Sequence, residues 1–308
     1  MILSVSRRTD IPGCYPEWFM NRLRDKYVMT RNPMNFHQVS QINLSPDFIE
    51  CIVFWTKNAV PFMDYLEELN RMGYMYMFQY TITPYDNTLE KNISDKSDII
   101  KNVLELSEKI EKKRIVWRYD PILLNDTYTV NRHIELFEEM CSLLYTAVNH
   151  VVISFIDLYQ KNRGYRLYEL STDEITHLAQ AFGEIGAKYK LPIKTCCENY
   201  DLTKFSITKG ACIDSVLLEE ICNRPLLLKK ATGQRKNCLC AESVDIGAYH
   251  TCLNGCIYCY ATDYKRLKTK QKCYDKNSQI LCDKLDFGKD IIKVRKMKKL
   301  EGEVENER

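Results

Sequence analysis

The chain has 308 residues, of which 45% are hydrophobic and 28% are charged, a balance that favours a globular protein with a sizeable core and excludes a disordered or fibrous chain. Its 44 basic and 41 acidic residues leave a net charge of only +3, which by itself says little about partners. No apolar run approaches the roughly 18 residues of a membrane span, and the N-terminus lacks the pattern of a signal peptide, so we expect a cytoplasmic protein with no membrane partner.

Short apolar runs that alternate with helical patterns predict an α/β fold. Apolar residues recur at helical spacing between the runs, for example Ile99, Val103, Leu106 and Ile110, and Ser171 with Glu174 forms a capping-box signature before another helix. Strands that are apolar on both faces are typical of buried parallel sheets, so the β–α alternation predicts a parallel sheet, either open or curled into a barrel. The six predicted strands cover residues 2–6, 49–56, 75–82, 114–119, 151–155 and 192–195.

Polar side chains gather just after each predicted strand. In parallel α/β folds, binding sites form at the carboxyl ends of the strands. Each residue could instead be an ordinary ion-paired or solvated loop residue, but arginines and carboxylates on one rim suit a zwitterionic ligand, because a guanidinium pairs well with a carboxylate. In chain order the residues are Arg7 and Asp10, Lys57, Gln79 and Tyr80, Arg118, Asp157, and Glu198.

Eleven of the 14 cysteines lie after residue 195, and in a reducing compartment such crowding indicates metal binding rather than disulfides. The stretch CLNGCIYCYA places Cys252, Cys256 and Cys259 at C-x3-C-x2-C spacing. Thiolates suit iron–sulfur clusters or zinc, and a zinc finger would want four ligands. Three cysteines on a 4Fe–4S cluster would leave one iron open to a small molecule.

A second cysteine group consists of Cys197, Cys212, Cys238 and Cys240. Four cysteines are enough for an auxiliary 4Fe–4S cluster or a structural zinc. Cys196 could replace Cys197, because adjacent residues at a strand end point opposite ways. The alternative is two buried thiols and an unrelated C-x-C turn, since spacing alone cannot pair distant cysteines.

The C-x3-C-x2-C stretch, with Tyr258 before its last cysteine, resembles the signature of radical S-adenosylmethionine enzymes. That resemblance implies a 4Fe–4S cluster on Cys252, Cys256 and Cys259, with Tyr258 beside S-adenosylmethionine bound to the open iron. It also implies reductive cleavage of the cofactor to a 5′-deoxyadenosyl radical that abstracts hydrogen from a substrate. A reductant such as flavodoxin or ferredoxin would then be a partner.

The same resemblance implies a full or partial barrel, and we expect a partial (β/α)6 TIM-like barrel over residues 1–200. Residues 201–265 would form a cysteine-rich iron–sulfur region on its carboxyl-end face, and residues 266–308 a basic and then acidic tail. In radical S-adenosylmethionine enzymes the cysteine loop follows the first strand, whereas here it follows the last predicted one. The barrel must therefore curl enough to bring its two edges near each other.

A closer resemblance covers nearly the whole chain up to Ala261. The motifs SRRTDIP at 6–12, RNP at 31–33, VFWTKN at 53–58 and the cysteine-rich stretch at 233–261 are similar to those of the domain-of-unknown-function 1848 family. That family is uncharacterised and is noted for a C-terminal cysteine cluster similar to the radical S-adenosylmethionine one. The resemblance supports the cluster and the architecture but implies no substrate.

If the cofactor sits on the cluster, the strand-end residues acquire predicted roles. Arg7 and Arg118 are predicted to contact its carboxylate, and Asp157 and Glu198 its amine or ribose. The remaining residues are predicted to face the substrate: Lys57, Asp10, Tyr80 and Gln79.

The substrate could be a small molecule or a nucleic acid. A distant likeness to spore photoproduct lyase makes nucleic acid one possibility. The two basic stretches, 265–272 and 293–299, could contact phosphates, but such stretches are more often solvated, and we favour that interpretation. The alternative function is a non-catalytic zinc or iron–sulfur protein that binds nucleic acid. Formation of 5′-deoxyadenosine would distinguish the two.

Overall fold

An eight-stranded sheet forms the centre of the computed structural model, which describes residues 1–158, 164–235 and 237–300. Its strands run in the order β10-β1-β4-β5-β6-β7-β8-β9, and every neighbouring pair is parallel. The predicted α/β class is confirmed. The strands are β1 (Ile2–Val5), β4 (Cys51–Thr56), β5 (Tyr76–Thr81), β6 (Ile115–Ile122), β7 (Val151–Phe155), β8 (Ile193–Cys196), β9 (Ile207–Gly210) and β10 (Ser243–Asp245).

The predicted count of six strands was wrong, although all six predicted strands are present. The two additional strands, β9 and β10, form the edges of the sheet and do not pair with each other in the described chain, so the sheet is open. Both are only three or four residues long and mix polar with apolar side chains. An edge strand needs no continuous apolar run, because one of its sides has no strand to pair with.

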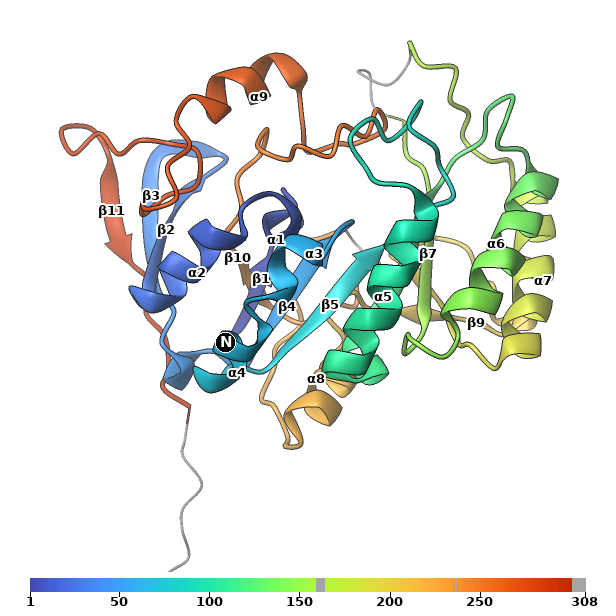
Figure 1. Ribbon diagram of the computed structural model, residues 1–308, viewed down its shortest axis with the longest axis horizontal. Coiled ribbons are helices and arrows are strands. Elements are labelled where there is room, and N and C mark those ends of the chain that lie inside the picture. The colour runs from blue at the N-terminus through green and yellow to red at the C-terminus, as the bar shows by residue number, and fades with distance from the viewer. Residues whose placement is uncertain (159–163, 236, 301–308) are drawn as a thin grey trace, which may run out of the picture.

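Helices cover the two faces of the sheet unequally. Seven helices pack on one face around the larger part of the core, and one short helix, α8, packs on the other. Figure 1 shows α5, α6 and α7 along one side of the sheet. The seven helices are α1 (Ile11–Cys14), α2 (Pro16–Arg24), α3 (Val60–Met63), α4 (Leu66–Arg71), α5 (Lys96–Ile110), α6 (Val130–Leu144) and α7 (Thr172–Tyr189), and α8 spans Ser215–Cys222.

The predicted capping box of α7 is confirmed. The Ser171 hydroxyl accepts a hydrogen bond from the Glu174 backbone N–H, and the Glu174 carboxylate accepts one from the Ser171 N–H. These contacts satisfy two donors that the first turn of a helix otherwise leaves unpaired.

Alternation along the strands explains how the α8 side of the sheet becomes a polar site. Successive strand residues point to opposite faces, so Phe54 and Phe78 join the helix-covered core while Val53 and Met77 pack against α8. Nearer the carboxyl ends, the row on the α8 side becomes polar or sulfur-bearing. Its members are Ser4, Trp55, Gln79, Arg118 and Cys196.

A separate three-stranded sheet joins the N-terminal hairpin to the C-terminal segment. Its order is β11-β3-β2, formed by β2 (Tyr27–Asn32), β3 (Asn35–Asn43) and β11 (Ile291–Val294). The helix α9 (Tyr264–Gln271) precedes β11. Two parts of the predicted basic tail, in α9 and β11, therefore have regular structure, while residues 301–308, its acidic end, lie outside the described residues.

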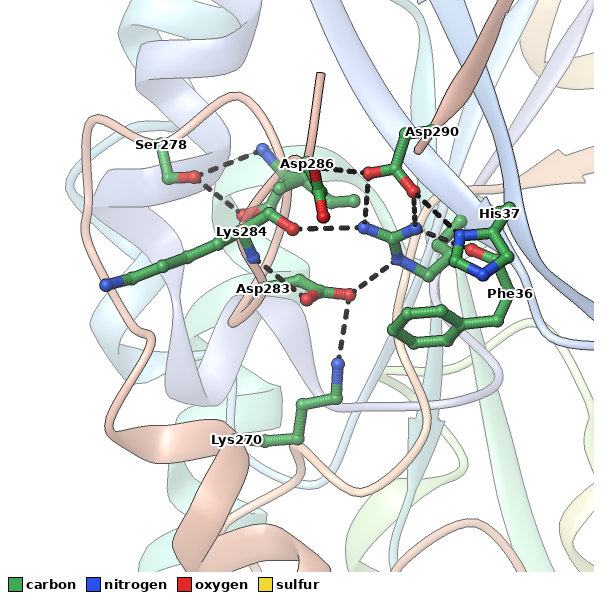
Figure 2. A network of polar contacts seen from close by, with 10 residues as sticks. Phe36, His37, Lys270, Ser278, Asp283, Lys284, Asp286 and Asp290 are labelled. Atoms are coloured by element: carbon green, nitrogen blue, oxygen red, sulfur yellow. Dashed lines mark hydrogen bonds and ion pairs between the residues drawn. The ribbon is translucent and has the colours of Figure 1, made fainter. Parts of the chain in front are cut away.

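Arg31 holds this C-terminal segment in place. Its guanidinium donates to Asp283 at 2.9 Å and to both carboxylate oxygens of Asp290, at 2.7 and 3.0 Å. Figure 2 shows Asp283 and Asp290 on either side of the guanidinium, with Lys270 reaching Asp283 from α9. No helix in the described part of the chain is both long and apolar enough to cross a membrane.

Candidate functional site

The cysteine loop follows a strand that lies directly beside the first one. β10 pairs in parallel with β1, with Ile2 opposite Ser243 and Ser4 opposite Asp245. Residues 252–259 therefore leave the sheet at its carboxyl end, next to β1. The expectation that the loop follows the sixth strand was wrong, and the edges of the sheet need not meet to bring the loop there.

Asp245, at the end of β10, ties the start of this loop to β1. Its carboxylate accepts hydrogen bonds from the Ser4 hydroxyl at 2.9 Å, the Ser6 hydroxyl at 2.6 Å and the Arg7 backbone N–H at 2.8 Å. A carboxylate that receives several donors holds its neighbours in fixed geometry. Asp245 belongs to the SVDIG motif, but its structural role was not predicted.

Contacts with the segment after β5 hold the cysteine loop from its other side. The Ile257 N–H donates to the Leu89 carbonyl at 3.0 Å, and the Asn92 side chain donates to the Leu253 carbonyl at 2.6 Å. Gly255 has φ of +75°, and a Cβ there would lie 3.0 Å from Asn92 Nδ2. The close approach and the left-handed backbone both favour glycine.

The three thiols of the loop lie near one another and near a lysine. Burial raises the pKa of the Cys256 thiol, Lys57 opposes that rise, and the neighbouring Cys252 and Cys259 add to it. Tyr264, which begins α9, lies within electrostatic reach of all three thiols. The loop thus presents three soft sulfur donors together, with a cation beside one of them.

The chemical type of these donors is the one that iron–sulfur clusters use. Among the residues that the structure describes, no three His, Cys, Asp or Glu side chains are arranged to hold one metal ion. A cluster of several irons is larger, and cysteine thiolates are its usual ligands.

A buried carboxylate, Glu90, organises the polar groups beneath Cys256. Glu90 is 1% exposed, and it accepts hydrogen bonds from Lys57 Nζ at 2.7 Å, Lys96 Nζ at 2.6 Å and the Thr83 hydroxyl at 2.5 Å. The Tyr258 hydroxyl donates to the same carboxylate. Burial alone would raise the pKa of Glu90, but Lys57 and Lys96 outweigh it and lower the pKa to about 2.

The ammonium group of Lys57 lies close enough to the cysteine loop to interact electrostatically with Cys256. Burial tends to lower its pKa, but the charges of Glu90 and Cys256 raise it above the ordinary value, so the ammonium stays protonated at neutral pH. Its Nζ also lies 5.8 Å from the centre of the Tyr258 ring. Lys57 and Tyr258, each predicted as a site residue, are thus brought together, although their contact with a substrate or cofactor stays a prediction.

Two other predicted substrate contacts are engaged within the protein. The Asp10 carboxylate accepts from the Gly13 N–H and the Lys57 N–H, both at 2.8 Å, and from the Asn254 side chain at 2.9 Å. Tyr80 is fully buried on the helix-covered face, where its hydroxyl accepts from the Ala59 N–H at 3.1 Å. Asp10 therefore fixes the loop around Asn254, and Tyr80 belongs to the core.

A pocket of about 310 Å³ borders the cysteine loop. Backbone and amide groups from the Asp10 loop, the end of β4 and the segment after Glu90 meet there. Its lining residues are Gly13, Cys14, Asn58, Asn92, Ile93, Ser94, Leu253 and Asn254.

Arg118, predicted to contact a cofactor carboxylate, lies with the second cysteine group. Its guanidinium donates to Cys212 Sγ at 3.0 Å and to Gln79 Oε1 at 3.4 Å, and it forms an ion pair with Asp120. Arg118 lies over the Trp55 ring at 5.3 Å, and Arg7 lies over the same ring at 5.1 Å. The two predicted arginines thus share one neighbourhood on the α8 side of the sheet.

The second cysteine group divides into two sets. Cys196 Sγ lies 2.7 Å from Cys212 Sγ, and the Cys240 thiol also makes a hydrogen bond with Cys212. Burial raises the pKa of the Cys197 thiol, and among neighbouring charges Cys238 contributes most to that rise. A second metal at this group stays a prediction.

The predicted acidic pair occupies the next strand ends. Glu198 Oε1 accepts from the Phe155 N–H at 3.0 Å, and burial, with Asp120 and Asp157 nearby, raises the pKa of Glu198 to about 7. Asp157 is exposed and pairs with Arg235 at 2.8 Å. Their contact with an amine or ribose stays a prediction.

Glu90, Lys96 and Asn254 are site residues that sequence reasoning missed. Glu90 lies in a loop well past the end of β5, and Lys96 begins α5, so neither follows a strand directly. Their partners are distant in sequence, which leaves no local pattern to indicate burial. Asn254 lies inside the cysteine stretch itself, and its partner, Asp10, is distant in sequence.

The comparisons with known proteins decide the family but no activity. The family model described as a domain of unknown function, DUF1848, matches residues 2–261. The chain belongs to the DUF1848 family. The DUF1848 match includes all three cysteines of the motif and leaves α9 and β11 outside it.

Other proteins add little to the DUF1848 assignment. No curated protein matches the chain. Among solved structures, a putative alpha-L-fucosidase from Bacteroides thetaiotaomicron VPI-5482 is similar at 12% identity, over 57% of this chain and 84% of that one, with a TM-score of 0.23. A likeness at that score carries no argument about fold or activity.

Proposed function

We propose that this DUF1848 protein is a radical S-adenosylmethionine enzyme with its cluster on Cys252, Cys256 and Cys259. The observation that carries the proposal is the pairing of β10 with β1, which brings the late cysteine loop to the carboxyl end of the sheet beside the first strand. In this proposal the open eight-stranded sheet is the partial barrel that the resemblance implies. When bound, the cluster and its cofactor would supply reductive cleavage of the S-adenosylmethionine carbon–sulfur bond, with an electron from a flavodoxin- or ferredoxin-like partner.

The residues beneath the loop would support that chemistry electrostatically. Three thiolates and a cluster carry net negative charge, and Lys57 places a cation beside Cys256. Glu90 and Tyr258 hold Lys57 in position. A buried cation near a redox centre favours the more negative, reduced form.

The strand ends beside Trp55 would bind the polar part of the cofactor. Arg7 offers a guanidinium close to the loop, and Glu198 offers a carboxyl group with a pKa of about 7. Such a carboxyl is partly ionised at neutral pH, and binding an ammonium group would draw it fully into the ionised form. Asp157 would have to leave Arg235 to contribute.

Anaerobic reconstitution tests the proposal. The protein is loaded with iron and sulfide, reduced with dithionite and incubated with S-adenosylmethionine, and 5′-deoxyadenosine and methionine are measured by chromatography. We expect both products from the wild type and a loss of at least a hundredfold in the Cys252→Ala, Cys256→Ala and Cys259→Ala variants. Cys273→Ala, which changes a cysteine outside the loop, should retain the activity.

A fully loaded and reduced cluster that never forms 5′-deoxyadenosine would contradict the proposal. That result would leave the alternative, a non-catalytic zinc or iron–sulfur protein that binds nucleic acid. Lys270 and Lys299, from the two basic stretches, pair with Asp283 and Asp47, so the structure gives the alternative no specific support.

A further inference from the structure

Two thiols from different segments of the chain meet on the α8 side of the sheet. β8 pairs with β9 so that Cys196 lies opposite Gly210. The chain then turns over this face, where Gln79 Nε2 donates to the Cys212 carbonyl at 2.7 Å. This turn places Cys212 Sγ 2.7 Å from Cys196 Sγ, and both cysteines are free thiols. The pair is distinct from the C-x3-C-x2-C loop.

Their separation favours a bond between the two sulfurs over a shared metal ion. A disulfide bond is about 2.0 Å long, so the sulfurs of Cys196 and Cys212 already lie close to bonding distance. In the part of the chain that the structure describes, no group of three ligand side chains is arranged around an ion. The geometry therefore suits a dithiol that can become a disulfide.

A guanidinium lies beside the inner thiol of the pair. Arg118 is 6% exposed, and its Nη1 donates to Cys212 Sγ at 3.0 Å. The hydrogen bond from Cys196 and the charge of Arg118 lower the pKa of the Cys212 thiol, although burial opposes them. The same hydrogen bond raises the pKa of Cys196, which keeps its proton. Cys212 is thus held in the thiolate form, which is the form that oxidants attack.

Exposure decides which oxidant can reach the pair. Cys212 is 5% exposed, whereas Cys196 is half-buried at the carboxyl end of β8. A buried sulfur of this kind is closed to another folded protein and to a bulky disulfide, but it admits a molecule as small as hydrogen peroxide. A thiolate with a second thiol in contact is also the usual arrangement of a site that peroxide oxidises reversibly.

We propose that Cys196 and Cys212 form a site of reversible oxidation by hydrogen peroxide, in which Cys212 reacts first and Cys196 closes a disulfide. The Cys212 thiolate attacks one peroxide oxygen, the O–O bond breaks, and the hydroxide that leaves takes a proton from solvent. The Cys196 sulfur then attacks the sulfur of the resulting sulfenic acid, the S–O bond breaks, and a second water leaves with the Cys196 proton.

The reaction balances without any further component. One thiolate, one thiol, one proton and one peroxide give one disulfide and two waters, so the two sulfurs lose the two electrons that the peroxide gains. A dithiol reductant restores both thiols by exchange and becomes a disulfide itself.

Oxidation would change the charge at this edge of the sheet. Arg118 would lose the negative sulfur that accepts its hydrogen bond and would be left with the carboxylate of Asp120 as its negative partner. Arg118 and Arg7 both lie over the Trp55 ring, so the disulfide would make the neighbourhood of these two arginines more positive.

Peptide mapping of the full-length wild-type protein tests the proposal. The fully reduced protein is treated with an equimolar amount of hydrogen peroxide, the remaining thiols are blocked with N-ethylmaleimide, and non-reduced peptides are sequenced by mass spectrometry. We expect a link between Cys196 and Cys212 that dithiothreitol reverses. Two matched variants, Cys197→Ser at the adjacent thiol and Cys240→Ser at another buried thiol of the group, should retain this link.

The order of reaction is tested with dimedone, which traps sulfenic acids. Cys196→Ser keeps a hydroxyl donor beside Cys212 but cannot close the disulfide, so Cys212 should accumulate as the dimedone adduct. Cys212→Ser should leave Cys196 without an adduct. Arg118→Met should slow the oxidation of Cys212 about tenfold because the thiolate loses its cation, and Arg118→Lys should slow it less.

Three results would overturn the proposal. The first is a wild-type protein in which cysteines of the C-x3-C-x2-C loop are oxidised but Cys196 and Cys212 stay unlinked. The second is a wild-type link from Cys212 to Cys240. The third is resistance of the pair to peroxide together with bound zinc or iron that persists when the loop cysteines are changed to alanine. The wild-type mapping needs no variant to fold, and none of these results depends on 5′-deoxyadenosine formation.

Discussion

At the scale of single residues, Glu90 is the side chain that connects the polar groups beside the cysteine loop. It balances two lysines, Lys57 and Lys96, and receives hydroxyl donors from Thr83 and Tyr258. A buried carboxylate is tolerated only when such partners compensate for lost hydration. Its removal would leave two ammonium groups with no counter-charge.

Glu90→Gln should therefore destabilise the protein by about 3–5 kcal/mol, the cost of leaving a buried charge unpaired. Urea unfolding at pH 7 measures this change. Glu68→Gln provides the control, because Glu68 pairs with the more exposed Arg24 and its loss should cost no more than about 1 kcal/mol. Equal effects of the two substitutions would show that Glu90 has no special role.

The same residue predicts a pH dependence. The folded-state pKa of Glu90 is about 2, below its ordinary value of 4.5, so its contribution to stability is present above about pH 4.5. That contribution is lost as the pH falls from 4.5 through 2. Unfolding curves across this range should show a smaller loss of stability for Glu90→Gln than for the wild type, and parallel curves would refute the assignment.

At the scale of elements, the shape of the cysteine loop depends on its backbone as well as its thiols. Hydrogen bonds fasten it to residues 89–92, and Gly255 lies where the two segments approach most closely. Such a turn combines a left-handed conformation with lack of space for a side chain. The loop's ability to present three thiols therefore depends on a residue that is not a ligand.

Gly255→Ala should reduce iron incorporation at the loop and destabilise the chain by about 1–3 kcal/mol, because a Cβ adds strain to a left-handed backbone. Gly73→Ala separates the two causes, since Gly73 has φ of +82° with nothing within 4 Å of its Cβ position. Iron content after reconstitution and thermal unfolding measure both variants. If Gly73→Ala lowered iron content equally, the close approach to Asn92 would not be the reason.

At the scale of the whole molecule, the C-terminal segment beyond the DUF1848 match is joined to the N-terminal hairpin. Arg31, in the RNP motif, pairs with Asp283 and Asp290 across more than 250 residues of sequence. Trp18, on α2, adds a hydrogen bond from its Nε1 to the Ser278 carbonyl at 2.8 Å. The segment 278–290 is thereby held against α2 and β2, and α9 connects this segment to the cysteine loop.

Arg31→Met should release the segment from residue 283 to β11 without unfolding the eight-stranded sheet. Hydrogen exchange measured by mass spectrometry should become faster in peptides from that segment and from β3, and stay unchanged in β5 and β6. Arg24→Met, which breaks an ion pair on the helix side, is the matched control. Unchanged exchange in β11 would mean that strand pairing alone holds it.

Local sequence pattern determined the central strands and the main helices. The apolar runs that became β1, β4, β5, β6 and β7 are mostly buried on both faces, and that requirement shows in composition alone. In β8 buried and half-buried residues alternate. The capping box before α7 and the three cysteines on one loop are also local, because every partner lies within a few residues. The sequence motifs also predicted that the chain belongs to the DUF1848 family, and the family match confirms it.

Only the tertiary structure decided how these parts meet. The place of β10 beside β1, the convergence of Lys57 and Lys96 on Glu90, and the contact of Cys196 with Cys212 all depend on contacts between distant segments. An edge strand of three residues and a carboxylate in a loop carry no periodic signal. The packing of the sheet's two faces brings these residues together, and their chemistry follows from that proximity.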